Sequence, residues 1–444
     1  MRIKSRRRVV PLIATLTASG LLMAGCSGGS SGGSSSGAGG SEPVSLTIFS
    51  GSGVDANIKT EQALGDAFTK ENPNIKIVID ASGPSDATID NVIKTRLATG
   101  SMADMFWYNS GSLFQNLNAD KTLLNIKDEA FAKNLDKSFV TTVSTANGIY
   151  GVPVQAAGAG GIFYNIPIYQ KLGLSIPTTW DEFMSNNEKI KAAGYTAVEQ
   201  TYGDSWTSQI VTLADFYNVY ANNPNWGTEW TQNKVNFVDD PVALRSFSKL
   251  QDLHDAGFFN ADFASAKLDD GLKAVATGTA ASYPMLAFAA TTIETNFPTQ
   301  AKDVGFFAIP GDSATHNGVT SWSPSAIYAP ATTPHPDAVK KFMAFIASPQ
   351  GCDAITATLG VTGPYMVKGC TLPKTAPRII SDMLPYYDRG DVAPALEFLS
   401  PVKGPNLPNF TVEVGSGIAD AKTAAAQYDK DAAAQAQQLG LPGW

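Results

Sequence analysis

Residues 147–194 read NGIYGVPVQAAGAGGIFYNIPIYQKLGLSIPTTWDEFMSNNEKIKAAG, and this stretch indicates the architecture of the chain. It opens with Tyr150-Gly151-Val152-Pro153, a short apolar segment whose glycine and proline favour an extended strand over a helix. Further on, Thr179 and Glu182 have the spacing of a capping box, in which a hydroxyl and a carboxylate satisfy free amides at a helix start. The stretch therefore predicts a strand and, after it, a capped helix.

Strands and helices alternate on the N-terminal side of this stretch. Strands are predicted at 45–49, 75–80 and 104–108, with helices at 59–70 and 88–98 between them. Such alternation is typical of a layered α/β architecture.

Helical periodicity returns in the second half of the chain. A helix beginning near Asp337 should bury one face, made of Val339, Phe342, Met343 and Ile346. A C-terminal helix is predicted from the spacing of Ile418, Ala421, Ala425, Tyr428, Ala432 and Leu439. By contrast, Trp226 and Trp230 lie in an Asn-rich stretch, which we interpret as a loop that forms a lid or a surface decoration.

The N-terminal segment has the composition of an export signal followed by a tether. Basic residues precede an apolar run at 9–22, and Ala24 and Gly25 stand before Cys26. This pattern resembles the lipobox of bacterial lipoproteins, in which the cysteine is acylated and becomes the first mature residue. We expect a signal peptide at 1–25, then a lipidated Cys26 and a flexible Ser/Gly linker at 26–43. A plain secretory peptide is the alternative.

Length and charge constrain the mature part. About 400 residues follow the linker, too many for one ordinary core and suitable for two lobes. Five of the 32 basic residues lie in the signal, so 27 stand against 40 acidic residues in the remainder. This acidic balance disfavours nucleic acid as a partner, because nucleic acid binding needs a basic face.

Apart from Cys26, the chain contains Cys352 and Cys370. An even pair in an oxidising compartment predicts a disulfide, which would stabilise the fold by about 3 kcal/mol by restricting the unfolded chain. Two reduced, buried thiols are the alternative. The histidines are scattered and no metal-ligand spacing occurs, so we expect no metal site.

One motif points to a different function. Gly51-Ser52-Gly53-Val54-Asp55-Ala56 follows a predicted strand and opens a helix, and Asp80 ends the next strand, as in the dinucleotide-binding fingerprint. Arg6-Arg7 also resembles a twin-arginine signal, so an exported NAD(P)-dependent oxidoreductase is an alternative. Against it, Asp55 would place a carboxylate beside the cofactor's pyrophosphate.

A wider resemblance spans almost the whole mature chain. IKTRLATGSMADMFWYNSGSLFQNL at 93–117 is similar to a helix–turn–Asp–strand pattern of extracellular solute-binding proteins, and 147–194 resembles their central signature. Later landmarks follow in the right order, namely ATGTAASYP at 276–284, VGFFAIPG at 304–311 and DAVKKFMAFIASPQG at 337–351. On these segments the chain is identified as a member of the maltose-binding-protein-like group of carbohydrate ABC transporters.

The resemblance implies a two-lobed, periplasmic-binding-protein-like (type II) α/β fold with hinge strands and an interlobe cleft that closes on a ligand. Residues 150–153 and 307–310 would be the hinge strands. Lobe I would comprise 44–153 plus 311–364, and lobe II would comprise 154–310 plus 365–444.

Ligand-binding candidates follow from the chemistry of sugars, which present C–H faces and rings of hydroxyls to a site. Candidate aromatic contacts at strand ends and loops are Trp107, Tyr108, Trp206, Tyr283 and Trp322. Candidate polar contacts are Ser50, Gly51, Ser52, Gln155 and Asp204. Packing or capping is the alternative role of these residues, and by alternation one of Trp107 and Tyr108 should point into the core.

The resemblance implies a lipid-anchored, extracytoplasmic receptor that binds a mono- or small oligosaccharide without turnover. Its partners would be two permease subunits and an ATPase of an ABC importer. We expect a monomer without a cofactor. An anchored glycoside hydrolase is a further alternative, which would require two carboxylates facing one glycosidic bond.

Overall fold

The computed structural model describes residues 43–51, 55–84 and 88–444. The predicted signal peptide, Cys26, nearly all of the linker and Ser52 lie outside the described residues. Within the described part the chain forms two α/β lobes, each built on its own sheet, which confirms the predicted fold class.

The sheet of lobe I has the strand order β2-β1-β3-β10-β4. Its strands are β1 (Val44–Gly51), β2 (Ile75–Gly83), β3 (Met105–Tyr108), β4 (Gly151–Pro153) and β10 (Ala326–Tyr328). β1 pairs in parallel with β2 and β3, whereas β10 runs antiparallel to both β3 and β4. The carboxyl ends of β1 and β3 therefore lie at one edge of this sheet.

The sheet of lobe II has the order β11-β9-β5-β7-β6, with β8 also paired to β5. Its strands are β5 (Gly158–Asn165), β6 (Thr196–Val198), β7 (Ala280–Leu286), β8 (Val304–Phe307), β9 (Val319–Trp322) and β11 (Val392–Pro394). β5 is antiparallel to β7, β8 and β9, and is the central strand.

Helices cover both faces of each sheet. Lobe I contains α1 (Asp55–Glu71), α2 (Ile89–Thr99), α3 (Ser112–Gln115), α4 (Ala119–Thr122), α5 (Lys137–Thr142), α14 (Pro336–Ile346) and α15 (Pro349–Leu359). Lobe II contains α6 (Ile166–Lys171), α7 (Trp180–Ala192), α8 (Ile210–Ala214), α9 (Phe216–Asn222), α10 (Trp226–Thr231), α11 (Pro241–Asp255), α12 (Leu268–Thr277), α13 (Ala290–Asn296), α16 (Arg378–Arg389), α17 (Leu396–Leu399), α18 (Leu407–Gly415) and α19 (Ala421–Gln438). None of the described helices is both long and apolar enough to cross a membrane.

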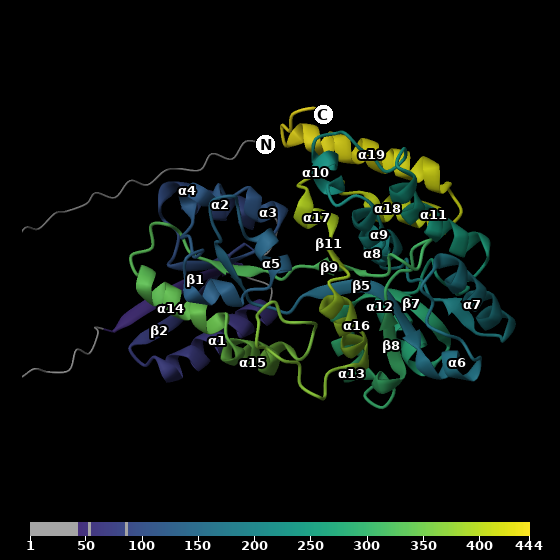
Figure 1. The fold of residues 1–444 in the computed structure, drawn as a ribbon, viewed down its shortest axis with the longest axis horizontal. Coiled ribbons are helices and arrows are strands. Elements are labelled where there is room, and N and C mark those ends of the chain that lie inside the picture. Colours follow the sequence, from purple (N-terminus) through teal and green to yellow (C-terminus); the bar gives the residue numbers. More distant parts are fainter. Residues whose placement is uncertain (1–42, 52–54, 85–87) are drawn as a thin grey trace, which may run out of the picture. The chain divides into compact units, whose positions relative to one another are not determined.

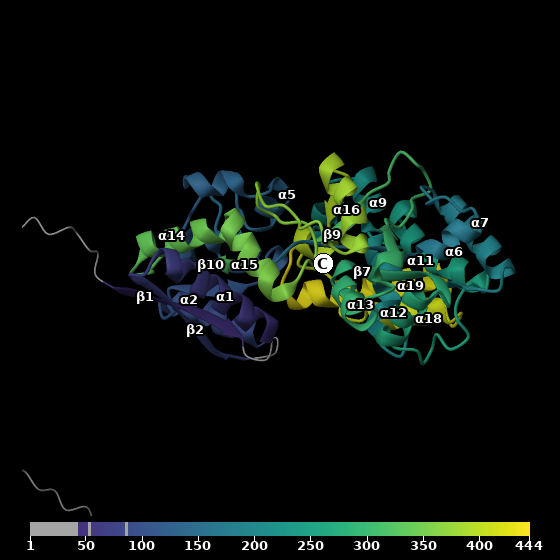
Figure 2. The ribbon, with the colours of Figure 1, turned by 90° about the horizontal axis from the view of Figure 1, so that it is seen from below.

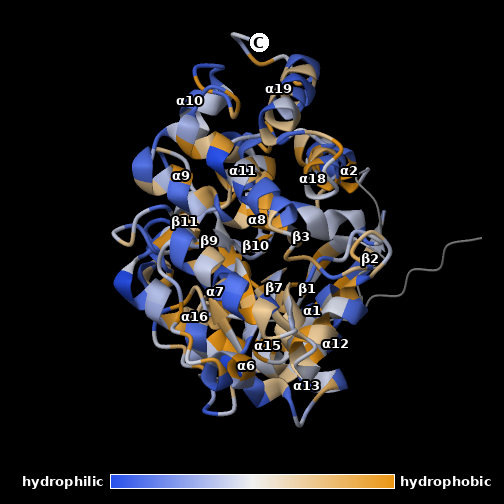
Figure 3. Cartoon of the chain, turned by 90° about the vertical axis from the view of Figure 1, so that its right-hand side faces the viewer, coloured by the Kyte–Doolittle hydropathy of each residue, from blue (hydrophilic) through white to orange (hydrophobic). Residues whose placement is uncertain are grey.

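Segments that are far apart in the sequence lie side by side. In Figure 1 the green helices α14 and α15 lie beside the purple strand β1 and helix α1, and α1 packs directly on α15. Figure 2 shows α1 and α2 next to β1 and β2 from a second direction. In Figure 3 strands such as β1 and β7 are pale to orange, whereas α7 and α19 carry many hydrophilic residues. The buried residues of α7, Trp180, Phe183 and Ile190, pack in one apolar cluster with residues of β5.

The chain crosses between the two sheets at 154–157, from β4 to β5, and again at 323–325, from β9 to β10. The second crossing lies later than the predicted one at 307–310. Phe307 pairs with Ile162 in the sheet of lobe II, and the carbonyl of Gly311 accepts a hydrogen bond from the Trp180 amide (2.7 Å). These backbone bonds keep the chain on lobe II until β9 ends.

Two predictions of helix structure are confirmed. Thr179 Oγ1 accepts the amide of Glu182 at 3.3 Å, and the Glu182 carboxylate accepts the amide of Thr179 at 3.2 Å, which completes the capping box of α7. The predicted apolar face of α14 is fully buried, with Val339, Phe342, Met343 and Ile346 all at 0% exposure.

The structure corrects two other predictions. Trp226 and Trp230 are not in a loop but in α10, where both are fully buried and their rings stack with centroids 5.3 Å apart. The C-terminal helix α19 excludes Ile418 and Leu439, which are 73% and 48% exposed. Leu439 caps the end of the helix, so helical spacing alone overestimated its apolar face.

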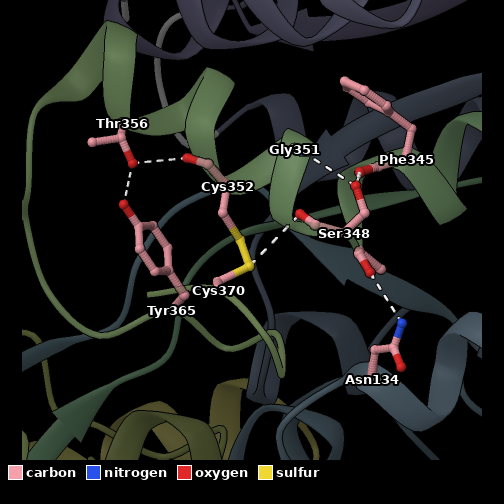
Figure 4. Close-up of a disulfide and its surroundings, with 9 residues drawn as sticks. Asn134, Phe345, Ser348, Gly351, Cys352, Thr356, Tyr365 and Cys370 are labelled. Atoms are coloured by element: carbon pink, nitrogen blue, oxygen red, sulfur yellow. Dashed lines mark hydrogen bonds between the residues drawn. A yellow bond between two sulfur atoms is a disulfide. The ribbon is translucent and has the colours of Figure 1, made fainter. Parts of the chain in front are cut away.

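A disulfide joins Cys352, on α15, to Cys370 (Figure 4). This confirms the predicted pairing. The bond fastens α15 to the segment around 365–370, whose Lys368 amide donates to the carbonyl of Asn134 in lobe I (2.7 Å). The chain therefore remains attached to lobe I beyond residue 364, where the predicted boundary lay.

A buried ion pair lies inside lobe II. Lys249 of α11 contacts Asp215, at the junction of α8 and α9, and both side chains are 1% exposed. Lys249 also donates to the carbonyl of Pro310 (2.7 Å), and Asn218 donates to Asp215 Oδ1 (2.7 Å). A buried charge is tolerated when it is paired and hydrogen-bonded in this way.

We expect Lys249→Met to lower the free energy of unfolding by about 3–5 kcal/mol, because it leaves the buried Asp215 without its cation. Urea denaturation at neutral pH measures this change. Lys189→Met, at an exposed position of α7, is the matched control and should stay within about 0.5 kcal/mol of wild type. Equal stabilities for the two variants would contradict the prediction.

Candidate functional site

A cavity of about 450 Å³ lies where the two sheets meet, and we call it the first cavity. Both crossing segments contribute to its wall, together with residues after β7 and after α15. Its lining consists of Gln155, Ala156, Ala157, Gly158, Ala159, Leu286, Ala287, Phe288, Thr291, Trp322, Ser323, Pro324, Leu359 and Thr362. The size is within the range of small-molecule sites.

The lobe II ends of the two crossing segments are held together next to this cavity. The hydroxyl of Tyr387, on α16, lies 2.7 Å from Ser321 Oγ and donates to the carbonyl of Gly158 at 3.1 Å. Burial raises the pKa of Tyr387, so the phenol stays protonated and able to donate. One side chain thereby fixes the start of β5 against the end of β9.

Aromatic side chains line the first cavity or lie beside it. Phe288 is 47% exposed, Trp322 is half-buried, and the ring of Trp206 lies 6.1 Å from that of Phe288. Trp322 has room because residue 160 is glycine, where a Cβ would lie 2.9 Å from the indole ring. Accessible rings of this kind can stack on the apolar face of a ligand.

The polar groups of the first cavity are uncharged. Gln155, Thr291, Ser323 and Thr362 supply amide and hydroxyl groups, and Gln155 Nε2 donates to Asn57 Oδ1 at 3.4 Å. Among the described residues that line this cavity, none has an ionisable side chain. A charged ligand would lose its hydration here without gaining a partner, so the cavity suits a neutral one.

Three predicted aromatic contacts lie in the core. Trp107 and Tyr108 are 6% and 4% exposed, because both faces of the lobe I sheet are covered, so alternation does not bring either to the surface. Tyr283 is 1% exposed, and its hydroxyl lies 2.6 Å from Thr201 Oγ1. Burial raises the pKa of Tyr283.

The other predicted contacts are spread over several elements. Gln155 and Trp322 meet in the first cavity, with Trp206 beside it. Asp204 Oδ2 accepts the amide of Leu268 at 2.8 Å and so caps the start of α12. Ser50, at 1% exposure, and Gly51 end β1, next to residues that are not described.

Phe288, Thr291 and Thr362 line the first cavity but were not among the predicted contacts. Phe288 lies two residues beyond the end of β7, which continues past Tyr283-Pro284 to Leu286. An aromatic residue just beyond a strand's end was the signal that could have identified it.

Two buried carboxyl groups lie near strand ends of the lobes. Glu61 of α1 is fully buried, and burial raises its pKa to about 8, an effect that a hydrogen bond with the Ser50 hydroxyl only partly offsets. Burial also raises the pKa of Glu199 to about 8, with Asp262 and Asp270 adding to the shift. In the described ranges no group of three or more His, Cys, Asp and Glu side chains could hold a metal ion.

Comparison with known families identifies the class of protein. The profile described as "Bacterial extracellular solute-binding protein" matches residues 54–351. This chain belongs to that family. The two-lobed fold and the cavity between its sheets agree with the assignment.

Individual relatives are similar over most of the chain. The Multiple sugar-binding protein of Streptococcus mutans is 28% identical over 315 residues, which cover 70% of this chain and 72% of the relative. The apo form of RafE from Streptococcus pneumoniae superposes with a TM-score of 0.72 at 21% identity, covering 88% of this chain and 98% of RafE. A sugar transporter from Bacillus licheniformis, solved with stachyose, gives a TM-score of 0.60 at 18% identity, covering 87% and 98%.

Glu61 should make stability depend on pH. Its pKa is raised from 4.5 to about 8 on folding, so between these values the folded protein keeps a proton that the unfolded chain loses. Stability therefore falls as pH rises through this window. Glu61→Gln should reduce that slope by up to about 1.4 kcal/mol per pH unit, measured by urea unfolding at successive pH values.

The control for this variant is Glu71→Gln, at the exposed end of the same helix. It should keep the wild-type slope. If Glu61→Gln and wild type lose stability equally between these pH values, Glu61 is ionised in the folded protein and the prediction is wrong.

Proposed function

We propose that this protein is an extracytoplasmic, lipid-anchored receptor that captures a neutral sugar between its lobes. It then delivers the sugar to the two permease subunits and the ATPase of an ABC importer. The observation that carries this proposal is the first cavity, which combines accessible aromatic rings with uncharged polar groups from both crossing segments. Similar proteins, among them the Multiple sugar-binding protein and a sugar transporter solved with stachyose, support the same ligand class.

The chemistry of the first cavity matches that of a sugar. Phe288 and Trp322 can cover the apolar C–H face of a pyranose, while Gln155 and Ser323 can bond its hydroxyls. One such hydrogen bond contributes only about 1 kcal/mol, so several contacts must act together to reach micromolar affinity.

The same lining favours a receptor over an enzyme. A glycoside hydrolase needs two carboxylates at a defined separation, and the described lining of the first cavity supplies none. The dinucleotide-like motif at 51–56 includes residues outside the described part, and the family assignment favours transport over oxidoreduction. Receptor function also accounts for two lobes joined by short crossings, because a ligand held between them favours their closed arrangement.

A carbohydrate panel tests this proposal directly. Purified protein is mixed with neutral sugars of several series, and binding is followed by thermal shift and by tryptophan fluorescence. Chromatography of the same mixtures then shows whether the sugar is unchanged. Binding without turnover is expected, whereas product formation would contradict the receptor function.

Phe288→Ala should weaken binding of the best sugar at least tenfold, because it removes a ring that faces the first cavity. The loss corresponds to about 1.4 kcal/mol of binding free energy. Isothermal titration calorimetry measures it. Ile176→Ala truncates another exposed apolar side chain, at 39% exposure, away from the cavity and should bind like wild type. An unchanged dissociation constant for Phe288→Ala would remove this residue from the site.

Cys26→Ser should move the protein from the membrane fraction to the soluble extracytoplasmic fraction, because a serine cannot receive the thioether-linked lipid. Immunoblotting of cell fractions measures the distribution. Ser27→Ala, one residue further on, should stay with the membrane. A variant without Cys26 that remains fully membrane-bound would contradict lipid anchoring at this residue.

A further inference from the structure

A second cavity, of about 640 Å³, lies beside the disulfide between Cys352 and Cys370. Its wall comes from the start of α5 in lobe I, from residues 364–366 and 370–372, and from the end of α16 and β11 in lobe II. Cys370 is one of the lining residues and is only partly buried, whereas Cys352 is 3% exposed. Cys370 is therefore the half of the disulfide that a small thiol can reach from this cavity.

We propose that this disulfide is a site of thiol–disulfide exchange, and that its reduction lowers the affinity of the first cavity for sugar. The inference rests on the proposed function, because it concerns the regulation of that same site. The co-reactant is a dithiol, which outside the cytoplasm would be the reduced form of a thiol–disulfide oxidoreductase.

The loop that the disulfide closes contributes to both cavities. Leu359 and Thr362 lie in the lining of the first cavity, and residues 364–366 lie in the lining of the second. The Ala157 amide, in the first crossing segment, donates to the carbonyl of Pro364 at 2.9 Å. A change in the freedom of this loop therefore acts on the wall of the first cavity and on one crossing segment.

The middle of the loop, residues 361–363, depends on the two ends of the loop for its position. In the described part of the chain these residues make no backbone–backbone hydrogen bond, and Val361 packs in an apolar cluster of lobe II. The loop thus leaves lobe I, contacts lobe II and returns to lobe I, where the Met366 carbonyl accepts the Asp136 amide at 2.9 Å. Because the disulfide joins the two ends, it limits the conformations that are open to the middle.

The surroundings of the two sulfurs favour one direction of exchange. A thiolate of the dithiol attacks Cys370 Sγ, forms a mixed disulfide there and expels Cys352 as a thiolate. Cys352 lies in the first turn of α15, where the positive end of the helix favours the departing negative charge. The second thiol of the reductant then displaces Cys370. The reductant ends as a disulfide, and the two cysteine sulfurs of the protein end as thiols after taking up protons.

Both thiols can be accommodated in the folded protein. Cys352 lies in an apolar cluster of lobe I, where a neutral thiol behaves as a small apolar group. Cys370 Sγ lies 3.6 Å from the carbonyl oxygen of Ser348, which can accept the hydrogen of the new thiol (Figure 4). The backbone bonds to Asn134 and Asp136 do not depend on the disulfide. Reduction should therefore loosen the loop without unfolding the protein.

Two single variants test which sulfur is accessible. All proteins in these experiments carry Cys26→Ser, so that this cysteine cannot react. Cys352→Ala leaves the thiol of Cys370, which should react with a maleimide in the folded protein. Cys370→Ala leaves the thiol of Cys352, which should react at least tenfold more slowly until urea is added. Mass spectrometry of the intact protein measures both rates, and equal rates would contradict the proposed direction of attack.

Sugar affinity tests the regulation. Calorimetry with the best sugar compares oxidised protein with protein treated with dithiothreitol, after mass spectrometry has verified full reduction. Reduction should weaken binding at least threefold, because a looser wall must be ordered when sugar binds. A chain carrying both Cys352→Ala and Cys370→Ala should bind as weakly as reduced protein and should not respond to dithiothreitol. Lys249→Met, which is destabilised inside lobe II away from this loop, should keep the affinity of the oxidised protein.

The outcomes separate this inference from the proposed function. If the reduced protein stays folded and binds sugar as strongly as the oxidised protein, the disulfide is only structural and the inference is overturned, while the receptor function stands. The inference is also overturned if dithiothreitol cannot reduce the folded protein, or if reduction unfolds it. If no sugar binds the oxidised protein, the proposed function fails and its regulation fails with it.

Discussion

The hydrogen bonds of the Tyr387 hydroxyl hold both crossing segments where they meet lobe II. This one group contacts Gly158 at the start of β5 and Ser321 near the end of β9, so α16 fixes the lobe II end of each crossing segment. The bonds use backbone and hydroxyl groups and no charge, and burial keeps the phenol protonated. Because the groups at this junction are uncharged, they add no net charge next to the first cavity, whose lining is also uncharged.

Residues 307–310 were predicted as a hinge, but contacts inside lobe II hold them in place. Residues 307–310 have the glycine-free, proline-ended composition of a short extended segment, yet Lys249 holds the Pro310 carbonyl and Asn218 holds that of Ile309 (3.4 Å). The buried ion pair behind them makes movement there costly, because any displacement would leave a desolvated charge poorly satisfied. The ion pair thus fixes 307–310 to lobe II, and the crossings at 154–157 and 323–325 are the ones that line the first cavity. Under the proposed function, a ligand in this cavity would contact both crossings, which is the condition for it to bias one arrangement of the lobes over another.

Local chemistry made much of the fold predictable, and tertiary context explains the rest. The capping box at Thr179 and the apolar face of α14 depend on neighbours three or four residues away, so sequence spacing was sufficient. Trp226 and Trp230 were misassigned because their Asn-rich flanks suggested a loop. Their rings are in fact buried by partners as distant as Val402, whose carbonyl accepts the Trp230 indole N–H.

The site was less predictable than the fold, because its residues also meet only through tertiary packing. Gln155 and Trp322 could be proposed from their residue types, but Phe288 and Thr362 reach the first cavity only through the packing of two lobes.

The free energy for binding must come mainly from surfaces that the unliganded protein leaves accessible. Phe288 is nearly half exposed at the wall of the first cavity, although large apolar side chains are usually buried, and Trp206 supports its ring from the side. Covering such a ring contributes about 25 cal/mol for each Å² removed from water, whereas a charged ligand would lose hydration without gaining a partner in this uncharged cavity.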